Sequence, residues 1–251
     1  MAWVLALVGL GLLSHTAPFP FLLDAVEPGR VMWRAPRSTG APTIYLTFDD
    51  GPNPTATPQL LDVLAREQVR ATFFVIPAHL TDDGARLVQR IFDEGHGVGL
   101  HTNSKRLVWG THADTAAWLE RSATQVEQLT GRRPCRAFRP HGGWRSAAMM
   151  SGLAEADYQL VGWGWNAWDF NWFKRRTARA TIDRIVSRAS DGLIAVIHDG
   201  HHEDPAADRT YAVEAVAGLI PALKQKGFRF GSICDAVDAE RQARGPAQAG
   251  R

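Results

Sequence analysis

The sequence predicts an α/β protein built around a distorted (β/α)7-type barrel of parallel strands. From residue 43 onward, short runs of β-branched and aromatic residues alternate with longer amphipathic stretches, which is typical of repeated strand–helix units. The chain has 251 residues, of which 45% are hydrophobic, so it can bury one large core. We therefore expect one domain of catalytic size.

The N-terminal segment differs in composition from the rest of the chain. Residues 2–13 are almost wholly apolar, which is the length of a signal-peptide core and shorter than the ~20 residues of a membrane span. Because no Lys or Arg precedes this run, an uncleaved membrane anchor fits slightly better than a cleaved signal. We assign residues 1–26 to this signal or anchor and residues 27–42 to a linker. The protein is expected to be membrane-anchored, in the cell envelope or secreted, and arginines between residues 30 and 37 leave its orientation open.

Residues 43–238 contain the expected catalytic domain, and residues 239–251 form a polar tail. Helical patterns with apolar residues at core spacing cover residues 58–67 and 114–129. Short apolar runs between such patterns predict seven strands. The predicted strands cover residues 44–48, 72–76, 98–101, 136–139, 159–163, 193–197 and 228–232.

Charge and cysteine content restrict the possible partners and cofactors. The formal net charge is +2, and no basic block is present that would follow a phosphate backbone, so nucleic acid is not an expected partner. The two cysteines, Cys135 and Cys234, lack metal-site spacing. They leave open a single bridge or two buried thiols, since a free thiol packs like a small apolar residue.

Polar residues gather at the ends of the predicted strands. Asp49 and Asp50 follow the first strand, and His101, Arg139 and His198 end the third, fourth and sixth strands. In parallel α/β barrels, the loops after the strands assemble the active site at this rim. The pattern therefore predicts a catalytic rim rather than scattered surface residues.

These residue types suit metal binding and acid–base chemistry. The Asp49–Asp50 pair precedes Gly51 and Pro52, so a tight turn would present both carboxylates. One carboxylate could bind a divalent metal while its neighbour acts as a base. The alternative is a turn that only satisfies backbone amides. His198 stands where an imidazole can protonate a leaving group.

In this order and spacing, the segments resemble the polysaccharide deacetylases of carbohydrate esterase family four, from about residue 43 to residue 237. Residues 47–51, Thr-Phe-Asp-Asp-Gly, are similar to the first motif of that family. The resemblance implies a barrel of the polysaccharide deacetylase kind. It also implies that Asp49 is the general base and that Asp50 is a metal ligand.

Two further motifs supply the groups around the base. Residues 138–143, Phe-Arg-Pro-His-Gly-Gly, resemble the third motif, which implies that Arg139 orients the base. Residues 196–198, Val-Ile-His, resemble the fifth motif, which implies that His198 is the general acid.

Residues 163–170 resemble the fourth motif. Asn166 stands where the first Asp of that motif usually lies, and Asp169 matches the second Asp, which implies that Asp169 tunes the acid. Aromatic faces near the third and fourth motifs could stack on sugar rings. The candidate substrate-binding residues are Trp144, Trp168 and His141.

The second motif departs from the family. Both histidines of its His-Ser/Thr-x-x-His pattern bind the metal, and here His101 is kept while Lys105 replaces the second histidine. An ammonium group cannot ligate a metal unless it loses its proton. Three interpretations stay open: another group completes the site, the Lys105 ammonium replaces the metal as the positive charge at the acyl oxygen, or the chain is a pseudoenzyme. Water or one of four histidines could complete the site: His112, His141, His201 or His202.

The sequence therefore predicts a carbohydrate deacetylase that acts on carbon–nitrogen bonds other than peptide bonds. It would remove an acetyl group from an N-acetylated or O-acetylated carbohydrate by attack of an activated water, with a divalent metal such as zinc. The expected partner is an acetylated glycan or glycolipid. The alternative is a catalytically impaired relative that binds glycans or serves as a scaffold.

Overall fold

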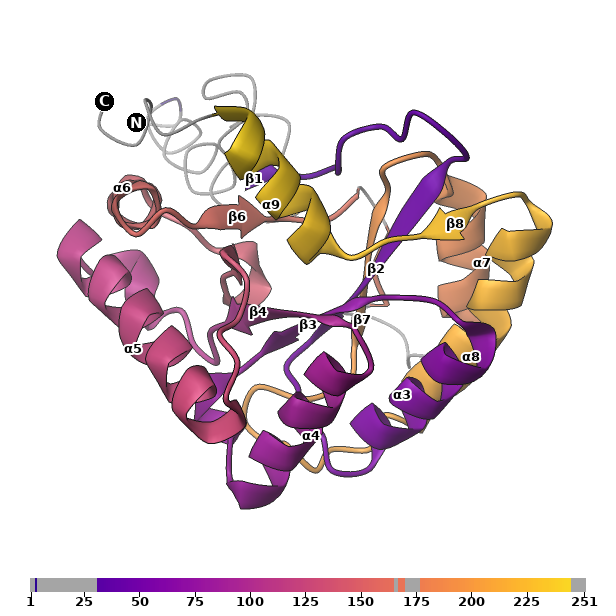
Figure 1. Cartoon of the computed structure of the whole chain (residues 1–251), viewed down its shortest axis with the longest axis horizontal. Helices are drawn as coiled ribbons and strands as arrows, with labels where there is room; N and C mark the ends of the chain where they lie inside the picture. Colours follow the sequence, from indigo (N-terminus) through magenta and orange to yellow (C-terminus); the bar gives the residue numbers. More distant parts are fainter. Residues whose placement is uncertain (1–2, 4–30, 165–166, 170–176, 245–251) are drawn as a thin grey trace.

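A curled sheet of eight strands forms the centre of the protein (Figure 1). The computed structural model describes Trp3 and residues 31–164, 167–169 and 177–244. All strand pairs of the sheet are parallel, in the order β1-β6-β5-β4-β3-β2-β7 with β8 paired to β2. The strands are β1 (Val31–Met32), β2 (Thr43–Asp49), β3 (Thr72–Val75), β4 (Gly97–His101), β5 (Ala137–Arg139), β6 (Gln159–Val161), β7 (Ile194–His198) and β8 (Arg229–Phe230).

The predicted α/β fold with a parallel, barrel-like sheet is confirmed. Each of the seven predicted strands overlaps one of β2 to β8. The additional strand β1 pairs with β6 and lies inside residues 27–42, so part of the segment predicted as a linker belongs to the sheet. An antiparallel bridge between Arg34 and Leu193 joins the chain after β1 to the start of β7, which brings the two ends of the sheet together.

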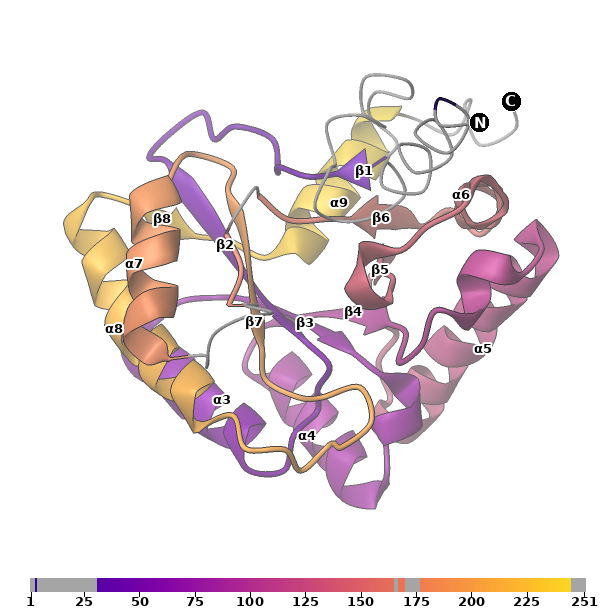
Figure 2. The ribbon, with the colours of Figure 1, turned by 180° about the vertical axis from the view of Figure 1, so that it is seen from behind.

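Most of the helices pack around the outside of this sheet (Figures 1 and 2). Both predicted helices are confirmed by α3 and α5, and three leucines of α3 are fully buried. A capping box between Thr111 and Asp114 begins α5, and Gly131 ends it with a φ of 72°, a conformation that suits glycine. The helices are α3 (Ala56–Glu67), α4 (Asp82–Asp93), α5 (His112–Thr130), α6 (Ala147–Glu155), α7 (Ala178–Arg188), α8 (Thr210–Gln225) and α9 (Ile233–Arg244), with short 3₁₀ turns η1 (Pro77–His79), η2 (Arg106–Trp109) and η3 (His141–Gly143).

The strands alternate between two hydrophobic clusters. In β2, Ile44, Leu46 and Phe48 belong to the larger cluster, which contains the buried residues of α3 and α8. Tyr45 packs against the smaller cluster, which contains the buried residues of α9. Because successive side chains of a strand point to opposite faces, the odd-numbered residues of β2 face the interior of the curled sheet.

The same alternation places the last residues of four strands on the interior face. The strands β2, β4, β5 and β7 end with Asp49, His101, Arg139 and His198. Each of these residues directly follows a residue of the larger hydrophobic cluster, whose side chain points to the opposite face. The parallel register pairs Asp49 with His198 and His101 with Arg139. The four predicted polar residues therefore meet at one rim.

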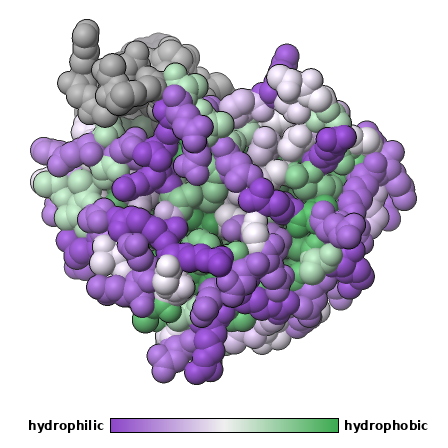
Figure 3. All heavy atoms as spheres, in the orientation of Figure 1, coloured by the Kyte–Doolittle hydropathy of each residue, from purple (hydrophilic) through white to green (hydrophobic). Residues whose placement is uncertain are grey.

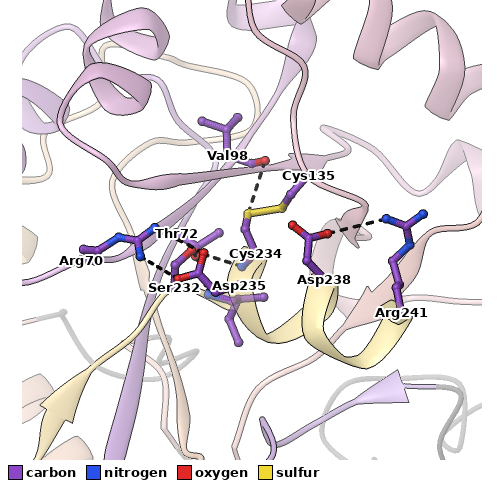
Figure 4. The surroundings of a disulfide bond; sticks show 10 residues. Arg70, Thr72, Val98, Cys135, Ser232, Cys234, Asp235, Asp238 and Arg241 are labelled. Atoms are coloured by element: carbon purple, nitrogen blue, oxygen red, sulfur yellow. Dashed lines mark hydrogen bonds and ion pairs between the residues drawn. A yellow bond between two sulfur atoms is a disulfide. The ribbon is translucent and has the colours of Figure 1, made fainter. Parts of the chain in front are cut away.

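Helix α9 covers the interior at the opposite end, where the strands begin. The Oγ1 atom of Thr72, the first residue of β3, lies 3.0 Å from Ser232 Oγ. A disulfide of 2.06 Å joins Cys234 in α9 to Cys135 just before β5 (Figure 4), so the single bridge left open by the sequence is formed. Since α9 continues to Arg244, the first residues of the predicted polar tail are helical.

The face of the molecule that carries α9 is mainly hydrophilic at its surface (Figure 3). Among the residues that the structure describes, no helix is long and apolar enough to cross a membrane. The predicted signal or anchor, residues 1–26, lies outside the described residues apart from Trp3.

Candidate active site

Asp49 and Arg139 form a buried ion pair at the interior rim. Arg139 is wholly buried, Asp49 is 3% exposed, and Arg139 Nη1 donates to Asp49 Oδ1 at 2.5 Å. The guanidinium also donates to Thr47 Oγ1 at 2.9 Å, Val161 O at 3.1 Å and Gly162 O at 2.9 Å. The guanidinium is therefore held in one direction by four oxygens, and it fixes one oxygen of the carboxylate.

His198 is held by a second carboxylate. Its Nδ1 lies 2.6 Å from Asp169 Oδ1, and its backbone N–H donates to Asp169 Oδ2 at 2.8 Å. Burial lowers the pKa of His198, but the charge and hydrogen bond of Asp169 oppose it and bring the pKa to about 9. With Nδ1 engaged, Nε2 is the nitrogen that can exchange a proton with a ligand.

Tyr211 completes this arrangement, although no sequence pattern pointed to it. Its hydroxyl donates to Asp169 Oδ2 at 2.6 Å from helix α8. Asp169 is 2% exposed, so its charge depends on the hydrogen bonds that it accepts. Tyr211 and His198 together hold both oxygens of the carboxylate.

Asp50, His101 and His141 form a group able to hold a metal ion. Each offers one ligand atom, and these atoms all lie within 4.8 Å of one another. Burial raises the pKa of Asp50, but the contact with His101 and the charges of His198 and His141 bring it below its usual range. The pKa of His141 falls to about 4, mainly through burial and then through His101 and His202. Its imidazole is therefore neutral near pH 7, as a ligand must be.

The contacts within this group fit a metal. Asp50 Oδ1 and His101 Nε2 lie 3.3 Å apart, and two ligands about 2.1 Å from one ion in a tetrahedral site are about 3.4 Å apart. Within the described part of the chain, the buried atoms Asp50 Oδ1 and His101 Nδ1 have no hydrogen-bond partner. A carboxylate and two imidazoles are a common donor set for catalytic zinc.

A hydrogen bond between two loops brings His141 to this group. Its backbone N–H donates to Thr102 Oγ1 at 2.8 Å, and Thr102 directly follows His101. The loop after β5 is thereby fastened to the loop after β4. Neither Thr102 nor the closeness of His141 was predicted from the spacing alone, although His141 was among the candidates.

Lys105 points elsewhere. Its ammonium lies 4.5 Å from the centroid of the Trp144 ring. Among the three interpretations of the second motif, this geometry favours completion of the site by another group over a metal-like role for the Lys105 ammonium.

The other candidate histidines occupy different places. His112 is exposed, and its Nε2 lies 3.9 Å from a carboxylate oxygen of Glu155. The His202 ring lies 4.4 Å from both the His141 and the His201 rings. His202 therefore borders His141 of the candidate metal-binding group and His201 lies beyond it, whereas His112 forms its contact at the surface.

Two glycines allow the loops after β2 and β7 to pack closely. Asp50 has a φ of 71°, a left-handed conformation that Asp tolerates. A Cβ on Gly200 would lie 2.0 Å from Asp50 O, and one on Gly51 would lie 2.5 Å from Asp199 Oδ2.

The buried carboxyl group of Asp199 lies behind this turn. Its Oδ2 atom accepts a hydrogen bond from Thr57 Oγ1 at 2.5 Å. Burial raises the pKa of Asp199 to about 7, the nearby carboxylates add to the rise, and the Thr57 hydrogen bond opposes it.

The tryptophan candidates lie near this rim or in the sheet. Trp168 forms a bridge with Val196, and its ring lies 6.3 Å from the Trp163 ring, so part of it lines the wall of the sheet. Trp144 is half-buried after η3. Asn166 lies outside the described residues.

The chain is similar to known deacetylases over most of its length. Residues 36–161 match the family model described as polysaccharide deacetylase. A peptidoglycan-N-acetylglucosamine deacetylase of Bacillus cereus is 33% identical, covering 85% of this chain and 96% of that protein. A chitooligosaccharide deacetylase of Sinorhizobium fredii is 37% identical, covering 79% and 94%. The solved structure of the Bc1960 peptidoglycan N-acetylglucosamine deacetylase has a TM-score of 0.72 and 25% identity, covering 85% of this chain and 95% of that chain.

The chain therefore belongs to the polysaccharide deacetylase family. It is a hydrolase, a carbohydrate deacetylase that acts on carbon–nitrogen bonds other than peptide bonds. These similarities favour the hydrolase over the pseudoenzyme, despite the lysine in the second motif.

Proposed function

We propose that this protein removes the acetyl group from an N-acetylated amino sugar in a cell-wall or chitin-like glycan. The observation that carries the proposal is the pairing of Asp49 with His198 across adjacent strands, beside Asp50, His101 and His141. This pairing supports the proposal, because Asp49 would serve as the base and His198 as the acid beside a group that can hold a metal. The named relatives, which act on peptidoglycan and chitooligosaccharides, support this substrate class.

In the proposed reaction, Asp49 takes a proton from a water molecule as that water attacks the acetyl carbon. Arg139 holds Oδ1 of the carboxylate and so orients the base. His198 donates its Nε2 proton to the sugar nitrogen as the carbon–nitrogen bond breaks, because Asp169 occupies Nδ1. The products are acetate and a free amine.

Asp50, His101 and His141 would hold the divalent metal. A metal such as zinc supplies a Lewis acid for the acetyl oxygen and for water. Imidazole and carboxylate ligands suit zinc and several other divalent ions, so metal content has to be measured. His141 would take the place of the second histidine of the family motif, which is Lys105 here.

We further propose that the protein works in the cell envelope on a glycan or glycolipid. Disulfides persist in oxidising compartments, and the Cys135–Cys234 bridge supports such a location. The apolar residues 2–13 would direct or anchor the chain there.

The test is acetate release from N-acetylglucosamine oligomers by purified protein with measured metal content. Wild type should release acetate, whereas Asp49→Asn should lose more than about 100-fold in rate because the base is gone. Asp83→Asn is the matched control, since Asp83 lies at the exposed start of α4. Equal activity of Asp49→Asn and wild type would refute the role of Asp49, and a metal-loaded wild type without activity on any acetylated glycan would refute the proposed function.

A further inference from the structure

The rim of the site carries a cation that the proposed reaction does not use. Lys105 is exposed at the start of η2, with its ammonium over the Trp144 ring. Within the described part of the chain, no carboxylate pairs with this ammonium, and its contact is with the indole. An ammonium has three N–H donors. An aromatic face attracts the charge but forms weaker contacts with these donors than the charge-assisted hydrogen bonds of a carboxylate.

The position of Trp144 is tied to the metal-binding group. Trp144 follows His141 by three residues, across Gly142 and Gly143, whose φ values are 60° and 71°. A Cβ on Gly142 would lie 3.2 Å from Trp144 Cδ1. The loop that carries His141 therefore also sets the indole, and through it the ammonium, at a fixed place beside the site.

The positive charge of Lys105 favours an anion. Burial, the neighbouring His101 and His202, and the charge of Lys105 lower the pKa of His141 to about 4, so the His141 ring stays neutral and Lys105 carries the positive charge beside it. The two carboxylates of the proposed reaction site lie against other groups, Asp49 against Arg139 and Asp50 at 3.3 Å from His101 Nε2. A carboxylate on a bound ligand would thus meet an unpaired ammonium.

We propose that Lys105 and Trp144 form a subsite for a sugar that carries a carboxylate and adjoins the acetylated sugar. The indole face stacks on the sugar ring, and the ammonium binds the carboxylate. This subsite rests on the proposed deacetylase function and names its substrate class as an acidic acetylated glycan. The lysine at position 105, where the family motif has a histidine, would then bind the carboxylate of the sugar next to the reacting one.

The test compares two oligosaccharides that differ only in charge. One is an acetylated peptidoglycan-type oligosaccharide whose sugars carry a lactyl carboxylate, and the other is the same molecule with that carboxylate converted to its amide. Lys105→Gln should raise KM for the carboxylate form about three- to tenfold and leave kcat and the amide form unchanged. Trp144→Leu should raise KM for both forms.

Arg106→Gln is the matched control, because it removes an exposed positive charge from the next residue. It should leave KM for both forms within about twofold. The subsite is overturned if wild type shows no preference for the carboxylate form, or if Lys105→Gln affects both forms equally.

Calorimetric binding of both oligosaccharides separates this proposal from the proposed function. If wild type binds but releases no acetate from either form, the proposed function fails. A binding preference for the carboxylate that Lys105→Gln removes would still support the subsite, and equal binding of both forms would overturn it.

Discussion

Replacing Asp49 by Asn is expected to destabilise the fold as well as to remove the proposed base. The Arg139 Nη1 and Asp49 Oδ1 atoms are 2.5 Å apart, and both side chains are buried. At an effective dielectric near 20, this separation corresponds to a gross attraction of about 7 kcal/mol, much of which offsets the desolvation of the two ions. Asparagine keeps an oxygen for the hydrogen bond but leaves the guanidinium charge unpaired. We therefore expect a loss of about 3 kcal/mol in the free energy of unfolding.

Urea unfolding followed by tryptophan fluorescence measures this loss as a lower midpoint at an unchanged slope. Arg139→Met should also destabilise, since it leaves Asp49 unpaired and removes donors from Val161 and Gly162. The double variant Asp49→Asn/Arg139→Met should be more stable than the sum of the two single losses predicts, by about 2 kcal/mol. Strict additivity, or a midpoint of Asp49→Asn equal to that of wild type, would refute the reasoning.

The activity test depends on this result. With a total stability of about 5–15 kcal/mol for a typical protein, Asp49→Asn should remain folded at 25 °C. Its loss of acetate release is evidence about the base only at a temperature where circular dichroism shows a folded variant.

The remaining predictions concern the metal, the acid and the disulfide. His141→Ala should weaken zinc affinity more than about 100-fold in a chelator competition. Loss of a residue that only hydrogen-bonds to a metal ligand already costs about 10- to 100-fold in affinity, and loss of a ligand should cost more. Unchanged affinity would exclude His141 as a ligand. On the alkaline side of the pH profile, activity should fall as pH increases through about 9, where His198 loses the proton that it donates. Tyr211→Phe removes a hydrogen bond from Asp169 and should move that decline to higher pH, because the carboxylate then attracts the imidazolium more strongly; a lower or unchanged midpoint of the pH profile contradicts this role. Replacing both cysteines by serine removes a disulfide between residues 99 positions apart. Urea unfolding should show a free energy of unfolding lower by about 4–5 kcal/mol, and a loss under about 1 kcal/mol would contradict a stabilising role of the bridge.

The rim was predictable from the sequence because it follows from two simple periodicities. Alternation within each strand and the common direction of parallel strands bring Asp49, His101, Arg139 and His198 together without knowledge of any loop. Strand β1 was missed because two residues, Val31 and Met32, are too few to show an alternating pattern.

The contacts made by loops and helices were not predictable in the same way. Tyr211 reaches Asp169 from α8 across 42 residues of sequence, and no local pattern links the two. The closeness of His141 depends on a hydrogen bond from its backbone N–H to Thr102 Oγ1 and on two glycines with positive φ in η3. Residue spacing specifies neither, so the sequence left His141 as one candidate of four.

The register between β4 and β5 would allow either of the two loops that follow these strands to supply a metal ligand. His101 and Arg139 are paired across these strands, so the loops that follow them begin side by side. The family motif has a ligand four residues after His101, at position 105. His141 lies two residues after Arg139, so both positions follow the same part of the rim. We infer that His141 can supply from the second loop what position 105 no longer supplies from the first, and that Lys105 is thereby free to contact Trp144. The metal test follows directly: Lys105→His should restore binding in a His141→Ala background if both loops reach one site, and a failure to restore it would mean that they do not.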